Sequence, residues 1–144
     1  MNTNNVKTKL VASILAVILL FITIPSVYVS AENRSIDSST LNVGGTIVDI
    51  ISVTGEKMAS GTTAANYYNP DITASVYAKY YSVDPSIMSY LPQEGYNQGT
   101  SSAVVSFLAP ENHVTDHISC NHSAKKGYYP GENGNTYARY NWYS

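Results

Sequence analysis

The segment Ile72 to Val83 constrains the fold of this chain more than any other segment, because its side chains alternate between two kinds. One parity is apolar and comprises Ile72, Ala74, Val76, Ala78 and Tyr80. The other parity is polar or amphipathic and comprises Thr73, Ser75, Tyr77, Lys79 and Tyr81. Successive side chains of a β-strand point to opposite faces of a sheet. The alternation therefore predicts a strand with one face in a core and the other in water.

Other segments have strand composition at intervals along the chain. Thr46 to Thr54 is dense in β-branched residues, which favour a pleated and half-buried surface. Thr100 to Ala109 alternates again, and Val114 to Ala124 and Thr136 to Tyr143 are further strand candidates. Short strands with little helix between them are typical of antiparallel sandwiches and barrels. The sequence thus predicts an all-β fold, either a small antiparallel β-sandwich or a barrel.

Three local signals predict the connections between these strands. Residues 55–71 hold several turn signals and are expected to form a long connection. Asp84 followed by Pro85 has the residues of a helix start, so we expect one short helical turn there. Asn133-Gly134 is flanked by strand-like runs, which is a signal for a two-residue hairpin turn. This hairpin would pair the last strand candidate with the segment just before the turn.

The N-terminal region has the three parts of a secretory signal peptide. Lys7 and Lys9 precede an uncharged stretch from Leu10 to Ile24, and Val29-Ser30-Ala31 supplies small residues for cleavage. The rival interpretation is an uncleaved anchor, but a helix over the uncharged stretch covers only about 22 Å of a hydrocarbon core about 30 Å thick. We expect cleavage after Ala31, which leaves a secreted, extracellular protein without stable membrane insertion.

Three regions follow from this boundary. Residues 1–31 are the expected signal peptide, and residues 46–144 are expected to form a single secreted β-rich domain. Between them, residues 32–45 are rich in Ser, Asn and Thr and end in two glycines. This polar segment is interpreted as a flexible leader or a loose first strand.

The charge and cysteine content of the chain limit its partners and its means of stabilisation. Lys7 and Lys9 belong to the signal, so six of the eight basic residues and all ten acidic residues remain, a net charge of −4. Such a chain has no basic footprint for nucleic acid or anionic lipid. Cys120 is the only cysteine, so no internal disulfide can form. The domain must be held by its core.

All three histidines and the only cysteine fall within ten residues, at His113, His117, Cys120 and His122. On a helix His113 and His117 would share a face, but the segment is rich in β-branched residues, and in a strand they lie about 13 Å apart. Cys120 and His122 would share a strand face at about 6.6 Å and can supply two ligands. We interpret the cluster as polar strand and loop residues rather than as a metal site, so no metal or cofactor is expected.

Catalytic motifs are not found. A single Cys120 at a strand end with Arg139 on the following strand would resemble a sortase, but that chemistry needs a histidine from an upstream element, and none precedes His113. The chain has no Gly-x-Ser-x-Gly elbow and no phosphate-binding loop. Carboxylate pairs for glycoside cleavage stay open, because such pairs meet only in space. We expect that the protein is not an enzyme.

Tyrosine is the residue type that stands out. The chain has 13 tyrosines, of which only Tyr28 lies in the expected signal. Tyr77 and Tyr81 share the polar face of one predicted strand, and Tyr137 and Tyr143 share a face of the last one. Amphipathic rings on a sheet make contact surface at low entropy cost. The alternative is that these rings pair across strands and only stabilise the sheet.

These features predict a secreted, non-catalytic binding or interaction module with candidate binding residues Tyr77, Tyr81, Tyr137 and Tyr143. The expected partner is a glycan or protein of the cell envelope or cell surface. The alternative is a secreted antimicrobial protein, because the tail at residues 140–143 (Tyr-Asn-Trp-Tyr) resembles the aromatic ends of some small β-rich bacteriocins. That resemblance is confined to four residues. The sequence leaves the oligomeric state open.

Overall fold

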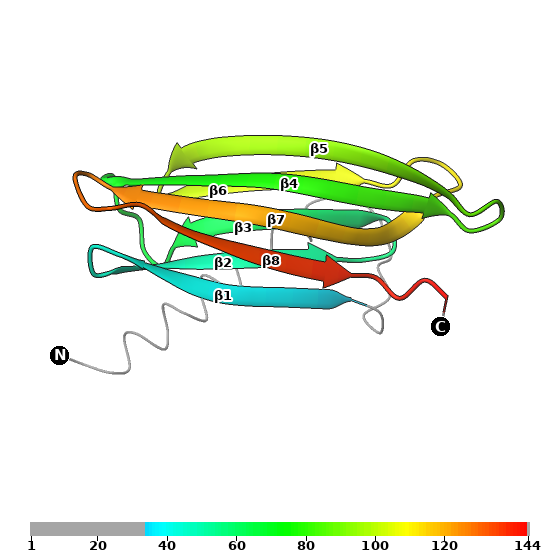
Figure 1. Ribbon diagram of the computed structural model, residues 1–144, viewed down its shortest axis with the longest axis horizontal. Coiled ribbons are helices and arrows are strands. Elements are labelled where there is room, and N and C mark those ends of the chain that lie inside the picture. The colour runs from blue at the N-terminus through cyan, green and yellow to red at the C-terminus, as the bar shows by residue number, and fades with distance from the viewer. Residues whose placement is uncertain (1–33, 144) are drawn as a thin grey trace.

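The computed structural model describes residues 34–143, and the expected signal peptide at residues 1–31 lies outside this range. Within the described range the chain forms strands and no helix, arranged as two antiparallel sheets of four strands (Figure 1). The prediction of an all-β antiparallel fold is confirmed. The strands are β1 Ser35–Val43, β2 Thr46–Thr54, β3 Met58–Ala65, β4 Ile72–Asp84, β5 Ser89–Thr100, β6 Ser102–Leu108, β7 Val114–Lys126 and β8 Glu132–Arg139.

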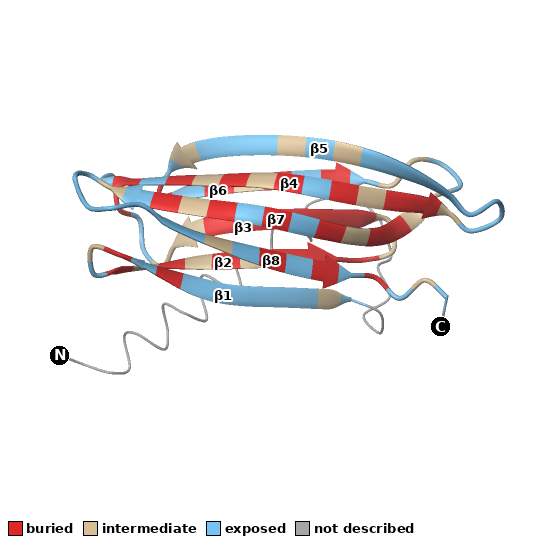
Figure 2. Cartoon of the chain, viewed as in Figure 1, coloured by how far each residue is buried: buried red, intermediate tan, exposed pale blue. Residues whose placement is uncertain are grey.

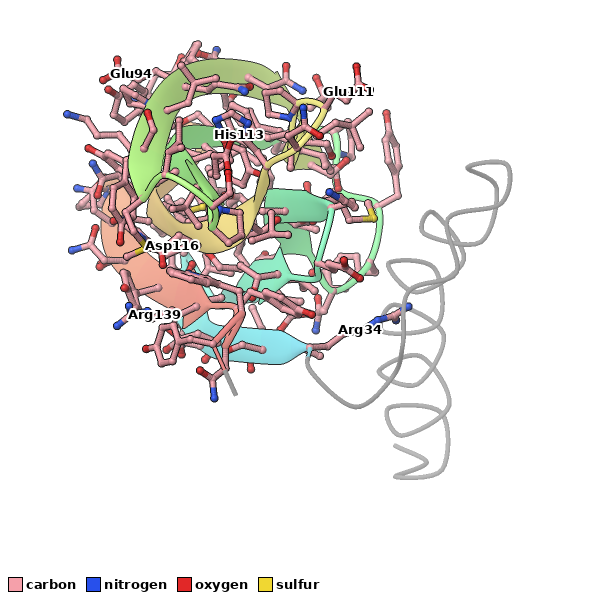
Figure 3. All side chains as sticks on the ribbon, turned by 90° about the vertical axis from the view of Figure 1, so that its right-hand side faces the viewer. Arg34, Glu94, Glu111, His113, Asp116 and Arg139 are labelled. Carbon is pink, nitrogen blue, oxygen red and sulfur yellow. The ribbon has the colours of Figure 1, made fainter. Side chains whose placement is uncertain are left out.

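The two sheets pack against each other through their inner faces. One has the strand order β1-β2-β3-β6, and the other has the order β5-β4-β7-β8. Short connections join β1 to β2 and β2 to β3 in the first sheet, and β4 to β5 and β7 to β8 in the second, whereas the chain crosses between sheets after β3, β5 and β6. Seen end-on in Figure 3, the strands surround a common interior.

The apolar parity of β4 faces this interior, as the alternation predicts. The buried residues of this parity are Ile72, Ala74, Val76, Ala78 and Tyr80, each with 0 % exposure. The ring of Tyr80 stacks on Phe107 of β6, with centroids 5.2 Å apart and planes 7° apart. Figure 2 shows the resulting alternation of buried and less buried residues along β4 and β7. The core therefore lies between the sheets and is lined by one parity of the long strands β4 and β7.

The hairpin between β1 and β2 closes through Gly44-Gly45. Their φ angles are +54° and +76°, and Val43 pairs directly with Thr46 across the turn. A two-residue type I′ turn needs positive φ at both central residues, which glycine adopts without steric cost. The two-residue hairpin turn of this chain is thus built from the Gly-Gly pair.

The prediction of a hairpin turn at Asn133-Gly134 is wrong, because the turn lies elsewhere. Both residues lie inside β8 and pair with β7. The turn lies at residues 127–131, where Gly127 has a φ of +50°. A Cβ at Gly134 would lie 2.6 Å from the Ile50 Cδ1 atom of the facing sheet, so a larger residue here would require that side chain to move. Sheet-to-sheet packing, rather than turn geometry, accounts for this glycine.

The prediction of a short helical turn at Asp84-Pro85 is also wrong. Residues 85–88 form the turn between β4 and β5. Asp84 Oδ1 accepts hydrogen bonds from the backbone N of Ser86 at 2.9 Å and from its hydroxyl at 2.6 Å, an Asx turn that needs no helix. Strand pairing begins at once, with Asp84 opposite Ser89. Pro92 then lies within β5, which tolerates proline because it is an edge strand.

Two segments without a clear strand signal in the sequence are strands. Of the two interpretations of residues 32–45, the structure shows the first strand for Ser35–Val43, which is the edge strand β1 and pairs with β2 along its whole length. The connection expected over residues 55–71 contains β3, whose small residues show no alternation. Each strand is fixed by backbone hydrogen bonds to a neighbour far along the chain or across a turn, and composition does not reveal these bonds.

Candidate binding face

The outer face of the sheet β5-β4-β7-β8 carries three rows of cross-strand neighbours, which we call the outer tyrosine face. The row nearest the β4–β5 turn consists of Pro92, Tyr81, His117 and Arg139. The second row consists of Glu94, Lys79, Ser119 and Tyr137. The third row consists of Tyr96, Tyr77, Asn121 and Asn135. Each row takes one residue from every strand of the sheet, so side chains distant in sequence become neighbours.

Tyr81, His117 and Tyr137 form one aromatic stack across β4, β7 and β8. The His117 ring lies 4.5 Å from the Tyr81 ring, with an angle of 18° between the planes. The Tyr137 ring lies 5.3 Å from the His117 ring on the other side and is tilted by 33°. Aromatic pairs of this kind contribute about 0.5–1.5 kcal/mol beyond their buried area. Two of the four candidate tyrosines are therefore joined by a residue of the strand between them.

Asp116 lies at a β-bulge immediately before the stacked histidine. Tyr81 of β4 pairs with His117, whereas the next residue, Ser82, pairs with Thr115, so Asp116 has no partner on β4. A bulge bends the strand and re-aims a side chain. The Asp116 side chain is directed to the C-terminal tail, and the residue is only 4 % exposed.

The Asp116 carboxylate accepts two short hydrogen bonds. His117 Nδ1 donates to Oδ2 at 2.7 Å, Trp142 Nε1 donates to Oδ1 at 2.7 Å, and Arg139 Nη2 lies 3.6 Å from Oδ1. Burial by itself raises the pKa of Asp116, but the hydrogen bonds from His117 and Trp142 and the charge of Arg139 outweigh it, so the net pKa is lowered. Because the ionised carboxylate can only accept, Nδ1 is the protonated nitrogen of His117.

The C-terminal tail continues this aromatic surface past the end of β8. The backbone N of Tyr140 donates to the Asp116 carbonyl at 2.8 Å. The rings of Trp142 and Tyr143 meet edge to face at 5.0 Å, and the Arg139 guanidinium lies over the Tyr143 ring at 5.4 Å. Figure 3 looks onto this end of the molecule and labels Asp116 and Arg139. One buried carboxylate thus holds both the stacked histidine and the tail.

Tyr77 occupies a different part of the outer tyrosine face. It pairs with Tyr96 of β5 and lies beside the ion pair between Lys79 and Glu94, whose charged atoms are 3.5 Å apart. The neighbouring Glu94 carboxylate raises the pKa of Tyr77. The Tyr96 hydroxyl donates to Gln98 Oε1 at 2.7 Å. These two tyrosine hydroxyls are therefore held by polar neighbours on the same face.

The structure places the four candidate tyrosines in three settings. Tyr81 and Tyr137 belong to the stack, Tyr77 lies on the same face two rows from Tyr81, and Tyr143 lies on the tail beside Arg139. The sequence did not single out His117 as part of this surface. The alternation along β7 indicates that His117 points outward. Which tyrosines are its neighbours depends on the register of β7 between β4 and β8.

The cluster of histidines and cysteine is dispersed by the strand that contains it. His113 lies in the connection before β7, and His117 faces outward. Cys120 and His122 face the interior, with 0 % and 1 % exposure. Over residues 34–143, no group of three or more His, Cys, Asp or Glu side chains is arranged to hold a metal ion.

Function must be inferred from this geometry. In the part of the chain that the structure describes, no helix has the length and apolar character needed to cross a membrane. A β-rich fold by itself does not specify an activity. No protein-family model, curated protein or solved structure matches the chain.

Proposed function

We propose that this protein is a secreted, non-catalytic binding module whose outer tyrosine face binds a cell-envelope glycan. The observation that carries the proposal is the stack of Tyr81, His117 and Tyr137, which the buried Asp116 carboxylate holds on a hydrogen-bonded sheet. Tyrosine offers an apolar ring to the C–H surfaces of a sugar and a hydroxyl to its polar groups. A stack that is already ordered loses little side-chain entropy on binding.

Uncharged polar side chains lie next to the stack. Ser119, Asn121 and Asn135 are exposed, and within residues 34–143 their side chains make no hydrogen bond to another residue. An amide supplies both donors and an acceptor, and a hydroxyl supplies one donor and accepts, which suits the hydroxyl groups of a sugar. A protein interface instead places apolar side chains at its centre. The centre of this face, around Ser119 and Asn121, therefore favours a glycan over a protein partner.

The charges on the face are paired within the protein. Lys79 lies 3.5 Å from Glu94, and Arg139 lies 3.6 Å from Asp116. Recognition of a polyanion requires several basic side chains available for phosphate or carboxylate groups. A glycan of neutral sugars fits a face whose cations already have carboxylate partners.

Secretion is the second part of the proposal. It is supported by the uncharged stretch from Leu10 to Ile24 and the small residues Val29-Ser30-Ala31 that follow it. We expect protein recovered from culture medium to have an intact mass that begins at Glu32. A membrane-bound species that retains residues 10–24 would contradict this assignment.

Trp142 provides a direct measurement of binding. It is the only tryptophan in the chain, and it contacts Asp116 and Tyr143 at the edge of the face. Neutral oligosaccharides released from cell walls should change its emission in a saturable way. Tyr81→Ser and Tyr137→Ser should each raise Kd by about fivefold to thirtyfold, which corresponds to roughly 1–2 kcal/mol.

The matched control is Tyr68→Ser. Tyr68 is 75 % exposed, but it lies in the connection between β3 and β4 and outside the outer tyrosine face. Its replacement should leave Kd unchanged. If Tyr68→Ser weakens binding as much as Tyr137→Ser does, or if no cell-wall oligosaccharide binds, the glycan proposal is wrong.

A further inference from the structure

A polar network crosses the interior and joins the two sheets. Thr63 Oγ1 of β3 lies 2.8 Å from His122 Nδ1 of β7, and His122 Nε2 lies 2.7 Å from Thr136 Oγ1 of β8. The Thr136 hydroxyl makes a short hydrogen bond with the hydroxyl of Ser52 on β2. All four residues are buried, and the most exposed of them has 3 % of its surface in contact with solvent. Two of these contacts join one sheet to the other.

The available protons fix the tautomer of His122. The Thr63 hydroxyl donates its proton to the backbone carbonyl of Ser75 at 2.9 Å, so it accepts from Nδ1–H of the imidazole. Nε2 therefore carries no proton and accepts from the Thr136 hydroxyl, which in turn accepts from Ser52. Both ring nitrogens of the neutral imidazole are satisfied by buried partners.

Protonation of the imidazole changes this arrangement. A proton on Nε2 requires an acceptor, so the Thr136 hydroxyl would have to turn its own proton toward Ser52 and displace the proton that Ser52 now donates. The charged group that acts on His122 is the carboxylate of Asp37 on β1, which favours the cation. The buried thiol of Cys120 lies on the same inward parity of β7. Burial outweighs the attraction of Asp37 and lowers the pKa of His122 to about 4.

We propose that His122 is an acid-sensitive latch, which holds the edge strand β8 against the facing sheet while neutral and releases it when protonated. β8 has a paired neighbour on one side only, because it ends its sheet. Two hydrogen bonds join it to the facing strands: the bond between Thr136 and Ser52, and the bond from the Tyr137 backbone N to Asp37 Oδ2 at 2.8 Å. Loss of the His122–Thr136 contact weakens the first of these directly.

Release of β8 would also disturb the outer tyrosine face. Thr136 points inward between Asn135 and Tyr137, which point outward on the same strand. Movement of β8 therefore moves the Tyr137 ring away from His117 of the stack. Loss of ligand in acid is a consequence that rests on the proposed function, whereas the release of β8 does not depend on any ligand.

The direction and size of the effect follow from proton linkage. The folded protein holds the pKa of His122 at about 4, below the ordinary value of 6.5 that a solvated ring would regain in the released state. The stabilisation by neutral His122 is therefore fully present above pH 6.5 and is lost progressively as the pH falls to 4. Between pH 6.5 and pH 4 the ratio of released to closed molecules should rise by about 80-fold.

The first experiment observes the latch in the unaltered protein. Nitrogen NMR of the histidine rings should show an unprotonated Nε2 on His122 at pH 7, with His113 and His117 as references in the same spectrum. Amide exchange should show that the protection of β8, corrected for intrinsic rates, falls by about 60-fold between pH 7 and pH 4.5. Titration of the His122 ring near pH 6.5 in a molecule that stays closed would overturn the proposal.

The second experiment uses the variant His122→Gln, which cannot titrate but keeps one donor and one acceptor. The protection of β8 should then lose the acid dependence of about 60-fold that His122 contributes in the unaltered protein. If His122→Gln shows the same acid loss of β8 protection as the unaltered protein, His122 is not the latch. Neither experiment requires a ligand, so failure of the glycan proposal leaves this test intact.

Discussion

The two sheets of the molecule differ in their aromatic content. No strand of the sheet β1-β2-β3-β6 contains a tyrosine, whereas the strands of the sheet β5-β4-β7-β8 contain six. These six are Tyr77, Tyr80, Tyr81, Tyr90, Tyr96 and Tyr137. The first sheet supplies small and aliphatic side chains and Phe107 to the core, and the second supplies both core residues and an aromatic surface. One sheet therefore acts mainly as a support, and the other carries the candidate binding face.

The small residues of the first sheet are what allow the sheets to approach. Gly61 on β3 faces Cys120, and a Cβ at Gly61 would collide with the Cys120 sulfur atom. In the second sheet Gly134 has the same role, because Ile50 and Leu41 of the first sheet fill the space beside it. Close packing in a core leaves no room for an added methyl group at such positions.

The largest effect should come from the inner tyrosine of β4. Tyr80→Ala removes a ring with 0 % exposure that stacks on Phe107, and it should lower the free energy of unfolding by about 3–5 kcal/mol. Tyr80→Phe should cost only about 1 kcal/mol, because it removes a single hydrogen bond to Thr115. Urea unfolding measures both values. A loss for Tyr80→Ala no larger than that for Tyr77→Ala would remove the distinction between the two faces of β4.

The second effect concerns the inner glycine of β8. Gly134→Val should lower the free energy of unfolding by about 1–3 kcal/mol, because its side chain would overlap Ile50 and Leu41. Asn135→Val, on the outward parity of the same strand, should stay within about 0.5 kcal/mol of the unaltered protein. Thermal unfolding of the pair tests the account. Equal losses for both variants would show that the loss at Gly134 does not come from contact between the sheets.

A smaller effect should follow from neutralising the carboxylate behind the stack. Asp116→Asn keeps the volume but cannot accept from both His117 and Trp142 with full strength, so it should cost about 1–2 kcal/mol and shift Trp142 emission to the red. Because the pKa of Asp116 is lowered on folding, its contribution is present above pH 3.8 and declines as the pH falls below that value. A variant with unchanged emission would show that the tail is held by other contacts.

The smallest effect should come from an outer tyrosine. Tyr137 is 49 % exposed and contacts His117 at a tilt, so Tyr137→Ser should lower the free energy of unfolding by less than about 1 kcal/mol. Chemical unfolding followed by Trp142 emission measures the change. A loss as large as that of Tyr80→Ala would place Tyr137 in the core and would refute its assignment to the binding face.

Much of the second sheet could be predicted from its own residues. The period-two alternation of β4 places Tyr77 and Tyr81 outward and Tyr80 inward, and the same periodicity separates Tyr137 from Thr136 on β8. Long strands with one core face have a strong local signal. β1 and β3 have none, because the former is polar and the latter consists of small residues. Their pairing with β2 gives them their structure.

In the candidate site, too, some features follow from the local sequence and others depend on strand pairing. The tyrosines were visible in the sequence, but the role of His117 depends on the register that sets it between Tyr81 and Tyr137. The direction of the Asp116 side chain depends on a β-bulge that the local sequence does not predict. The sequence does not predict the roles of Asn133-Gly134 and Asp84-Pro85, because each pair is compatible with more than one local structure and the neighbouring strands select between them.

The sequence by itself determined the strand type, the inward and outward parities, the absence of an internal disulfide and the abundance of tyrosine. Local periodicity and composition are sufficient for these properties, since a β-strand fixes side-chain direction residue by residue. Only the tertiary structure decided which strands are neighbours, and therefore which residues meet in the stack, at the Asp116 bulge and in the His122 network. Those contacts join residues up to 84 positions apart, as between Ser52 and Thr136, and such pairing is set by the packing of whole sheets rather than by any local pattern.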